Sequence, residues 1–218
     1  MDAEFWHSRW ESGNTPWHQG RVNARLERNI DRLPAPESGR VMVPLCGRAY
    51  DMRWLLDRGH RLLGVELSAV AVRGFLDEHG LSFERSTDGA FERFDAPGAR
   101  MLCGDVFALT REHLAEVRAV YDRAALIALP PETRRRYAAH LVSILPPAAP
   151  MLVVTIEYPR GETDGPPFSV DEAEVRDLFE PARRVERVES IDVLDTEPGL
   201  ARRGLSRLVE HAFLVHGG

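Results

Sequence analysis

Three predicted strands end in charged residues whose chemistry suits a nucleoside and an anion. Glu66 ends one predicted strand, Asp105 follows a second, and Arg123 ends a third. A carboxylate such as Glu66 can accept hydrogen bonds from both hydroxyls of a ribose. Asp105 could accept a hydrogen bond from an adenine amino group, with Leu67 and Val106 as apolar walls for the ring. Arg123 could pair with a carboxylate or an anionic substrate.

Each of these charged residues also has an ordinary structural explanation. Glu66 could be an exposed carboxylate at a strand end, and Asp105 could cap a turn, as Asp does in many loops. Arg123 could form an ion pair with Asp122 or Glu157. The combination is more informative than any one residue, because the carboxyl ends of neighbouring parallel strands meet in one crevice. The sequence therefore favours a nucleoside-sized site that also binds an anion.

The turn after the first predicted strand differs from a phosphate-binding loop. The stretch VMVPLCGRAYDM, residues 41–52, reads as a buried strand, a tight turn and a helix start, and its single glycine is Gly47. Glu66 follows 19 residues later, close to the spacing of a dinucleotide fingerprint. Pro44 and Cys46 stand where further glycines would let the backbone approach a pyrophosphate. We therefore expect a nucleoside ligand without a phosphate, and Cys46 as a small packing residue.

Composition excludes several classes of enzyme. All 28 basic residues are arginine, so a P-loop, a protein-kinase site, a Schiff base and a pyridoxal enzyme are excluded, because each needs an amine. There is no Gly-x-Ser-x-Gly elbow, and the histidines and two cysteines lack metal-ligand spacing. The formal net charge of −6 argues against a nucleic-acid partner. The arginine clusters at 134–136 and 202–203 are expected to be solvated surfaces.

The sequence also predicts where the protein works. No apolar run approaches the roughly 20 residues of a membrane helix, and the first residues, MDAEFWHSRW, lack the pattern of a secretory signal. Cys46 and Cys103 are expected to be free thiols in a reducing compartment. We expect a cytoplasmic protein with a small-molecule substrate and with neither a membrane nor a nucleic-acid partner.

Apolar strands and amphipathic helices alternate along the chain, which implies a parallel sheet covered on both faces. Residues 83–94 are expected to form a hairpin that turns at Asp88-Gly89, and two final runs, 184–190 and 207–215, predict an antiparallel, half-exposed pair. The other expected strands are 41–45, 62–67, 101–103, 117–121 and 151–158. The expected helices are 22–33, about 52–58, 68–79, a short one after residue 110, and 131–144. A last helix is expected to begin at a Ser169-x-x-Glu172 capping box and to run through residue 179.

These elements predict an α/β fold in one domain, residues 1–218. We expect a Rossmann-like seven-stranded mixed sheet, with five parallel strands plus an antiparallel C-terminal pair and helices on both faces. Residues 1–33 are expected to form a helical lid segment, and residues 41–218 the catalytic core. This is the architecture of the S-adenosylmethionine-dependent methyltransferases, although such a likeness concerns the fold and not the function.

Four stretches of the sequence resemble one methyltransferase family. They are FWHSRWESGNTPWHQ, VPLCGRAYDMRWLLDRGHRLLGVELS, VYDRAALIALPPETRRRYA and GPPFSV. The Pro-Leu-Cys-Gly turn followed by Asp-Met-x-Trp-Leu is specific, because general methyltransferases have a Gly-x-Gly type of turn there. On these motifs the chain is identified as a member of the thiopurine S-methyltransferases, over nearly its whole length. The resemblance implies S-adenosylmethionine as methyl donor, an aromatic or heterocyclic thiol as acceptor, and a monomer.

The resemblance also implies roles for individual residues. Cofactor contacts are implied at Trp10, Leu45, Glu66, Asp105, Val106 and Arg123. The acceptor pocket is implied at Trp17, Arg123, Pro166 and Pro167. A further pocket arginine is expected between residues 198 and 204, where either Arg202 or Arg203 could match. Arg123 is the candidate for orienting the acceptor, and no general base is assigned, because thiols of this kind ionise readily.

The N-terminal aromatic residues have two explanations. Trp10 and Trp17 are expected to close over the crevice, Trp17 because it lies in the helix break SGNTPWHQG, whereas Phe5 and Trp6 are expected to pack within an amphipathic helix. An aromatic face beside a sulfonium cation is stabilising by about 0.5–2 kcal/mol when desolvated. We therefore expect the N-terminal segment to shield the cofactor.

Two other functions stay open at the level of the sequence. Selenium or tellurium species are soft nucleophiles like thiols, so the same site could methylate them. A protein that binds the cofactor without catalysis, as a sensor, is the second alternative. Residues such as Glu66 and Arg123, and the Pro166-Pro167-Phe168 segment, favour the enzyme.

Overall fold

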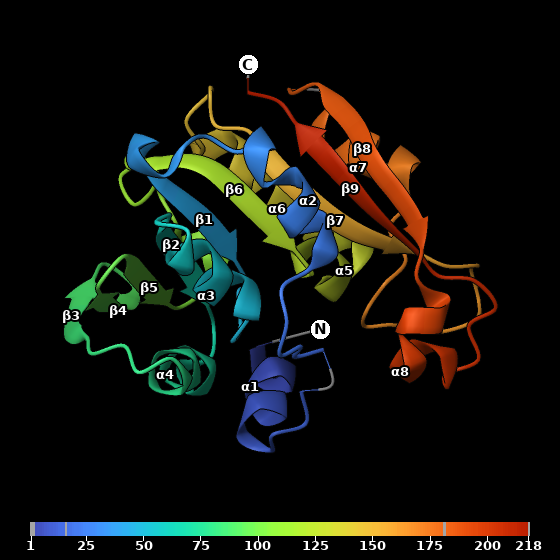
Figure 1. Cartoon of the computed structure of the whole chain (residues 1–218), viewed down its shortest axis with the longest axis horizontal. Helices are drawn as coiled ribbons and strands as arrows, with labels where there is room; N and C mark the ends of the chain where they lie inside the picture. Colours follow the sequence, from blue (N-terminus) through green and yellow to red (C-terminus); the bar gives the residue numbers. More distant parts are fainter. Residues whose placement is uncertain (1–2, 16, 181, 218) are drawn as a thin grey trace.

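The computed structural model describes residues 3–15, 17–180 and 182–217, which form one mixed sheet of nine strands (Figure 1). The strands are β1 Arg40–Pro44, β2 Arg61–Glu66, β3 Glu84–Asp88, β4 Phe91–Ala96, β5 Ala99–Cys103, β6 Val117–Arg123, β7 Met151–Glu157, β8 Val185–Asp192 and β9 Val209–Val215, in the order β3-β4-β5-β2-β1-β6-β7-β9-β8. Five neighbouring strands, β5-β2-β1-β6-β7 in spatial order, are parallel. Because β1 lies between β2 and β6, the strand order reverses there, and a ligand crevice is expected at the carboxyl ends.

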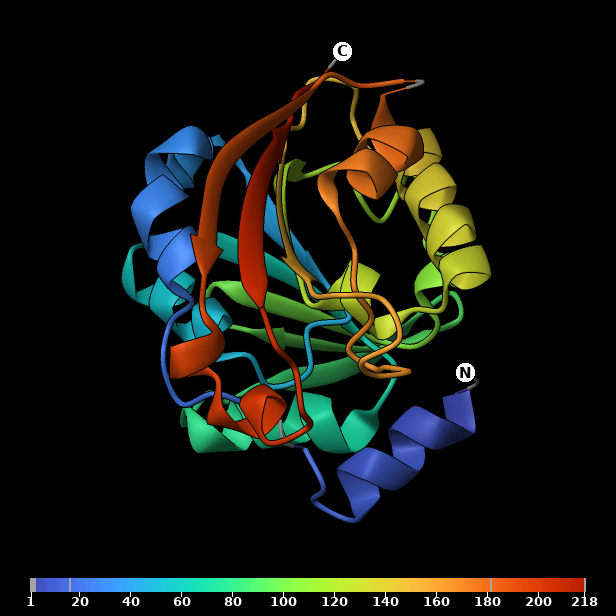
Figure 2. The same cartoon turned by 90° about the vertical axis from the view of Figure 1, so that its right-hand side faces the viewer.

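Helices cover both faces of this sheet (Figure 2). One core cluster joins α2, α3 and α4 to the sheet through Leu26, Leu55 and Phe75, and a second joins α6 and α7 to the other face through Tyr137 and Phe179. The helices are α1 Ala3–Glu11, α2 Ala24–Asn29, α3 Tyr50–Asp57, α4 Ala69–Glu78, α5 Ala125–Ala128, α6 Pro131–Ile144, α7 Glu172–Phe179 and α8 Pro198–Ala201. The predicted α/β architecture with helices on both faces is therefore confirmed.

The N-terminal segment divides between the core and the crevice. α2 lies on the face of the sheet, where Leu26 and Leu33 belong to the buried core. α1 instead lies beside α4, near the edge of the sheet at which β1 ends (Figure 1). The proposed lid comprises residues 1–33. Because α2 packs on the sheet, only α1 and the segment that follows it could cover a crevice at this edge.

The sheet has nine strands where the sequence pattern predicts seven, because the 83–94 hairpin joins it. β3 and β4 form the predicted hairpin, with Gly89-Ala90 as its turn, one residue later than expected, and β4 pairs antiparallel with β5. β4 carries Phe91 and Phe94, which are 1% and 0% exposed and belong to the cores on opposite faces of the sheet. A hairpin separate from the sheet could not bury both rings, so apolar burial holds β4 against β5.

Three local expectations are wrong. α7 begins after Asp171, whose side chain accepts a hydrogen bond from the N–H of Glu174 at 2.8 Å, whereas the Ser169 hydroxyl bonds the backbone of Tyr158. The residues after Thr110 form turns and no helix. β9 is almost wholly buried, because it lies between β7 and β8, so of this pair only β8 is a half-exposed edge.

Arg134, in the arginine cluster expected to be solvated, is buried. Its side chain is 1% exposed; it donates to the carbonyl oxygens of Leu126 and Leu129 at 2.7 and 2.9 Å, and it pairs with Glu174. The guanidinium also lies over the Phe168 ring, 5.8 Å from its centroid. Arg134 thus fixes α5, α7 and the chain near residue 168 relative to one another.

Asp122 is a buried carboxyl group whose ionisation should lower stability. Its Oδ2 accepts a hydrogen bond from the Tyr137 hydroxyl at 2.7 Å. Burial raises the pKa of Asp122 from 3.8 to about 6, against the opposing effect of the Tyr137 hydrogen bond. The folded state therefore holds this proton more tightly than the unfolded chain, and the contribution of Asp122 to the free energy of unfolding falls as pH rises from about 4 to about 6.

The free energy of unfolding should fall less with rising pH in Asp122→Asn than in wild type, and we expect the difference to be about 2–3 kcal/mol. Urea denaturation of the variant at pH 4 and pH 7 should show a smaller fall in the free energy of unfolding than wild type shows. Asp31→Asn, at an exposed position, is the control and should leave the fall unchanged. Identical pH dependence in wild type and Asp122→Asn would contradict the assignment.

Candidate active site

The turn between β1 and α3 is tight and is covered by a tryptophan. Leu45 and Gly47 both have positive φ, 47° and 52°. A Cβ atom on Gly47 would lie 2.8 Å from Cζ2 of Trp10, so the indole lies directly on the glycine. Trp10 is 7% exposed, and the Arg48 guanidinium is 5.7 Å from its ring centroid. The turn and α1 therefore meet at Gly47, where the Trp10 indole covers the turn.

We expect Gly47→Ala to disturb both the turn and the indole that covers it. The substitution strains a left-handed residue by about 1–2 kcal/mol and also forces Trp10 to move. Gly13→Ala is a matched control, because Gly13 has a φ of 68° and a Cβ there would meet nothing within 4 Å. Both variants should lose thermal stability, but only Gly47→Ala should weaken binding of S-adenosylmethionine in calorimetry. Equal affinities for the two variants would show that Trp10 does not depend on Gly47.

Glu66 is buried at the carboxyl end of β2 and is bound to the same turn. Its Oε2 accepts a hydrogen bond from the Gly47 N–H, and its Oε1 accepts one from the Ser68 N–H, both at 2.9 Å. Glu66 is 6% exposed, so the explanation of an exposed carboxylate at a strand end is wrong. Burial raises the pKa of Glu66 despite these hydrogen bonds. Since a carboxylate oxygen has two lone-pair sites, both oxygens can still accept from a ligand.

Asp105 and Val106 lie next to Glu66, because β5 pairs with β2. The register places Cys103 opposite Glu66, and the Gly104 N–H donates to the Glu66 carbonyl oxygen at 2.9 Å. The exposed Asp105 caps a short 3-10 helix, Val106–Ala108, by accepting from the Phe107 N–H at 3.0 Å. The capping explanation of Asp105 is thus confirmed for one carboxylate oxygen. A role toward an adenine amino group stays a prediction.

Arg123 ends β6 beside the turn, and its acidic neighbour is Asp51 of α3. Nη1 of Arg123 lies 3.6 Å from Oδ2 of Asp51. The two expected partners are engaged elsewhere, since Asp122 accepts from Tyr137 and Glu157 lies 2.9 Å from Nε2 of His211. Burial lowers the pKa of Arg123, but the carboxylate of Asp51 and other nearby acids outweigh it and leave the pKa raised. Arg123 is therefore a cation at every accessible pH.

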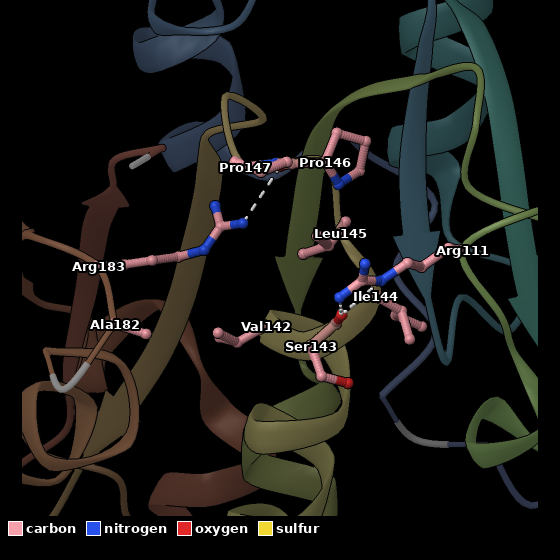
Figure 3. A pocket seen from close by; sticks show the side chains of 9 residues that line it. All are labelled: Arg111, Val142, Ser143, Ile144, Leu145, Pro146, Pro147, Ala182 and Arg183. Atoms are coloured by element: carbon pink, nitrogen blue, oxygen red, sulfur yellow. Dashed lines mark hydrogen bonds between the residues drawn. The ribbon is translucent and has the colours of Figure 1, made fainter.

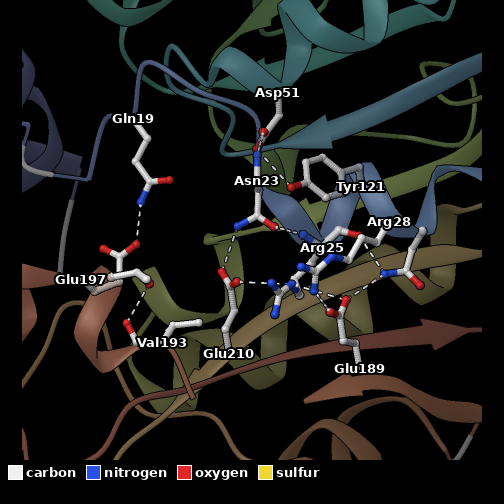
Figure 4. A network of polar contacts seen from close by, with 12 residues as sticks. Gln19, Asn23, Arg25, Arg28, Asp51, Tyr121, Glu189, Val193, Glu197 and Glu210 are labelled. Atoms are coloured by element: carbon white, nitrogen blue, oxygen red, sulfur yellow. Dashed lines mark hydrogen bonds and ion pairs between the residues drawn. The ribbon is translucent and has the colours of Figure 1, made fainter. Parts of the chain in front are cut away.

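The predicted acceptor residues lie on two segments at this edge of the sheet. Trp17 lies edge-on to Trp10, with ring centroids 5.8 Å apart, and edge-on to Trp6 at 5.5 Å. The 17–23 segment, here called the N-terminal strap, reaches the chain before α8 through a hydrogen bond of 3.2 Å from Gln19 Nε2 to Glu197 Oε1 (Figure 4). The Trp6 ring is thus part of the same aromatic cluster as Trp17.

The second segment is the loop around Pro166 and Pro167. The Tyr158 hydroxyl donates to the Pro167 carbonyl oxygen at 2.8 Å, and Nη1 of Arg203 donates to the Pro166 carbonyl oxygen at 3.1 Å. Arg203 therefore lies at the predicted acceptor loop. Arg202 and Arg203 are both exposed, and Arg203 bonds this loop through the Pro166 carbonyl oxygen. The match of either arginine to the family's pocket arginine stays a prediction.

Sequence reasoning missed Asp51, Tyr121 and His18 as members of this site. Asp51 lies in the first turn of α3, and the Tyr121 hydroxyl donates to its Oδ2 at 3.0 Å. His18 lies 4.0 Å from Glu78, and burial, followed by the charge of Arg48, lowers the pKa of the imidazole. No sequence signal marks these residues, because each is defined by a neighbour from a distant part of the chain.

A surface hollow of about 360 Å³ lies at the opposite edge of the sheet and has a structural explanation (Figure 3). It lies between the end of α6 and residues 182–183. Arg183 donates to the Ala149 carbonyl oxygen at 2.6 Å, and Arg111 donates to that of Ser143 at 2.9 Å. Both arginines thus satisfy backbone groups after or at the end of α6. Within the described ranges, no helix could span a bilayer, and no group of three or more His, Cys, Asp or Glu could hold a metal ion.

Solved structures with bound S-adenosylhomocysteine share this fold. A Burkholderia thailandensis 1,6-didemethyltoxoflavin-N1-methyltransferase aligns with a TM-score of 0.60 at 18% identity, over 99% of this chain and 87% of that chain. A Synechocystis magnesium protoporphyrin IX methyltransferase aligns with a TM-score of 0.62 at 14% identity, over 99% and 100%. At such identities the likeness shows the methyltransferase fold alone.

Sequence comparison is more specific. A thiopurine S-methyltransferase of Pseudomonas aeruginosa is 46% identical over 218 residues and covers 100% of both chains. One from Xanthomonas axonopodis pv. citri is 47% identical over 208 residues and covers 95% of both. The profile of the thiopurine S-methyltransferase family matches residues 1–217. These matches over the full length of the chain show that it belongs to the thiopurine S-methyltransferase family.

Proposed function

We propose that this protein transfers a methyl group from S-adenosylmethionine to the sulfur of an aromatic or heterocyclic thiol, such as a thiopurine. The observation that carries the proposal is the buried Glu66 carboxylate bound to the Gly47 N–H at 2.9 Å. We infer that this carboxylate accepts hydrogen bonds from the ribose, beside a turn that has no phosphate cradle. Arg123 provides a cation two strands away, where an anionic acceptor can bind. Family membership supports the same reaction.

The residues at this edge fit S-adenosylmethionine. Glu66 can accept hydrogen bonds from the ribose hydroxyls, while Val106 and Asp105 lie at the end of β5 for the adenine. The backbone around Leu45 is placed for the amino-acid end, and the Trp10 indole offers an aromatic face to a cation. When bound, S-adenosylmethionine supplies a methyl group activated by a sulfonium.

The acceptor side is proposed to comprise Trp17, Arg123, Pro166, Pro167 and Arg203. Arg123 would attract the thiolate and hold it in line with the methyl group. Proximity and orientation are the main contributions to the rate, because charge is neutralised during the transfer. Trp10 and Trp17 would exclude water, which strengthens the contacts of Arg123. The chain needs no dedicated base, since thiols of this class ionise near neutral pH.

The test is a substrate screen with S-adenosylmethionine labelled in the methyl group. We expect transfer to 6-mercaptopurine and to other aromatic thiols. Selenite and tellurite form a second arm, and transfer of the label to the metalloid in that arm without thiol methylation would move the assignment to metalloids. Cofactor binding in calorimetry with no turnover in either arm would indicate the sensor instead and would overturn the proposal. We also propose a monomer, which light scattering tests directly.

A further inference from the structure

Asp51 is a buried carboxylate that meets two distant parts of the chain, Asn23 at the end of the strap and Tyr121 on β6 (Figure 4). Its Oδ1 accepts a hydrogen bond from the backbone N–H of Asn23 at 2.7 Å, and its Oδ2 accepts one from the Tyr121 hydroxyl at 3.0 Å. Nη1 of Arg123 lies 3.6 Å from the same Oδ2. Asp51 is 0% exposed, and a buried charge is unfavourable unless its surroundings compensate it. Its partners therefore indicate what it does.

We propose that Asp51 is a positioning residue, which orients Arg123 toward the methyl acceptor and links that orientation to the N-terminal strap. The inference rests on the proposed function, because it concerns how the acceptor arginine of that site is held. It assigns Asp51 no contact with substrate. Asp51 acts through Arg123 on one side and through Asn23 on the other.

The contact with Arg123 holds the guanidinium by charge rather than by a short hydrogen bond. A separation of 3.6 Å is longer than a hydrogen bond, so the N–H donors of Arg123 remain available to an anionic ligand. The Arg123 side chain is 16% exposed, which leaves part of it accessible. Tyr121 lies two residues earlier on β6, hence on the same face of the sheet, and fixes Oδ2 in front of Arg123. One end of the guanidinium is thereby anchored while the other can meet the acceptor.

The contact with Asn23 places the end of the strap on the same carboxylate. Asn23 begins α2, where its Oδ1 accepts from the Arg25 N–H at 2.8 Å and its Nδ2 donates to Glu210 at 2.9 Å. The strap between Trp17 and Asn23 is therefore held at its carboxyl end by Asp51 and β9. Because Trp17 is a predicted wall of the acceptor pocket, Asp51 fixes that wall and the acceptor arginine in one geometry.

Asp51→Asn separates the role toward Arg123 from the role in folding. The amide oxygen of asparagine can accept from the Asn23 N–H, and the amide N–H₂ can donate to the Tyr121 hydroxyl, which accepts as well as donates. Both hydrogen bonds are thus retained. Only the negative charge that faces Arg123 is lost. We expect the variant to fold with a melting temperature close to that of wild type and to bind S-adenosylmethionine within about threefold of wild type.

The expected kinetic effect of Asp51→Asn is a fall in kcat/KM for the thiol acceptor of about tenfold to a hundredfold, mainly through KM. Tyr121→Phe should give a smaller fall in the same parameter, because it frees Oδ2 to turn away from Arg123. A matched control is Tyr137→Phe, which removes the hydrogen bond to a second buried aspartate, Asp122 of β6, at 2.7 Å. That pair lies on the opposite face of the sheet, and among the described residues no arginine pairs with Asp122. Tyr137→Phe should therefore leave acceptor kinetics unchanged.

A double-mutant cycle with Arg123→Ala gives the decisive readout. If Asp51 acts through Arg123, Asp51→Asn adds less than about twofold to the loss caused by Arg123→Ala, because neighbours in one interaction are not additive. Multiplication of the two losses in the double variant would show an independent, structural effect and overturn the inference, as would unchanged acceptor kinetics in Asp51→Asn alone. Absence of thiol methylation by wild type would instead be a failure of the proposed function. The two failures are therefore distinguishable.

Discussion

Replacing Arg123 with alanine should lower kcat/KM for the thiol acceptor by about a hundredfold or more. The side chain is a partly exposed cation at the carboxyl end of β6, with Asp51 3.6 Å from its Nη1. The variant would lose the proposed charge-assisted contact with an anionic acceptor, and such contacts contribute most where the charge is largely removed from water. Steady-state kinetics with varied acceptor at saturating S-adenosylmethionine measure the effect. Cofactor affinity in calorimetry should fall by much less.

Two further variants sharpen this result. Arg123→Lys keeps the charge but not the planar fork of donors, so it should recover only part of the lost kcat/KM. Arg118→Ala is the control on the same strand, because Arg118 is exposed at the amino end of β6, far from the crevice. It should retain the acceptor kinetics of wild type. If Arg123→Ala changed cofactor affinity and left acceptor kinetics intact, Arg123 would be a cofactor ligand and not the acceptor-orienting residue.

Replacing Glu66 with alanine should weaken S-adenosylmethionine binding by about a hundredfold. The variant loses the acceptor for the ribose hydroxyls, and it also leaves the N–H groups of Gly47 and Ser68 without the carboxylate that they now meet at 2.9 Å. Two hydrogen bonds from the ribose hydroxyls, at about 1.5 kcal/mol each, correspond to a loss of about a hundredfold. Titration calorimetry measures the dissociation constant. Glu66→Gln should lose less than Glu66→Ala, because the amide oxygen still accepts.

The pH dependence of binding gives a second check on Glu66. Burial raises the pKa of this carboxyl group above its ordinary value, and only the ionised form can accept hydrogen bonds through both oxygens. Cofactor affinity should therefore fall as pH is lowered toward that raised pKa, and this fall should disappear in Glu66→Gln. Glu116→Gln is the control, since Glu116 pairs with Arg40 near the amino ends of β1 and β6. Unchanged affinity in Glu66→Ala would exclude the ribose role.

Local sequence determined most of the elements of this fold. The apolar runs at 41–45 and 62–67 form β1 and β2, and Ser68 caps α4 by accepting from the Ala71 N–H. Alternating strands and helices imply a parallel sheet, because such strands need a crossover between them. The same logic placed Glu66 and Arg123 at one edge. Periodicity and capping act over a few residues, so they can be read from the sequence alone.

Tertiary structure decided which of these residues meet. The sequence leaves Arg202 and Arg203 equivalent, whereas in the structure Arg203 donates a hydrogen bond to the Pro166 carbonyl oxygen. The 83–94 hairpin joins the sheet because Phe91 and Phe94 need cores on opposite faces. Asp51 meets Asn23 and Arg123, which lie 28 and 72 residues away along the chain. Such contacts depend on how whole elements pack, so no short stretch of sequence encodes them.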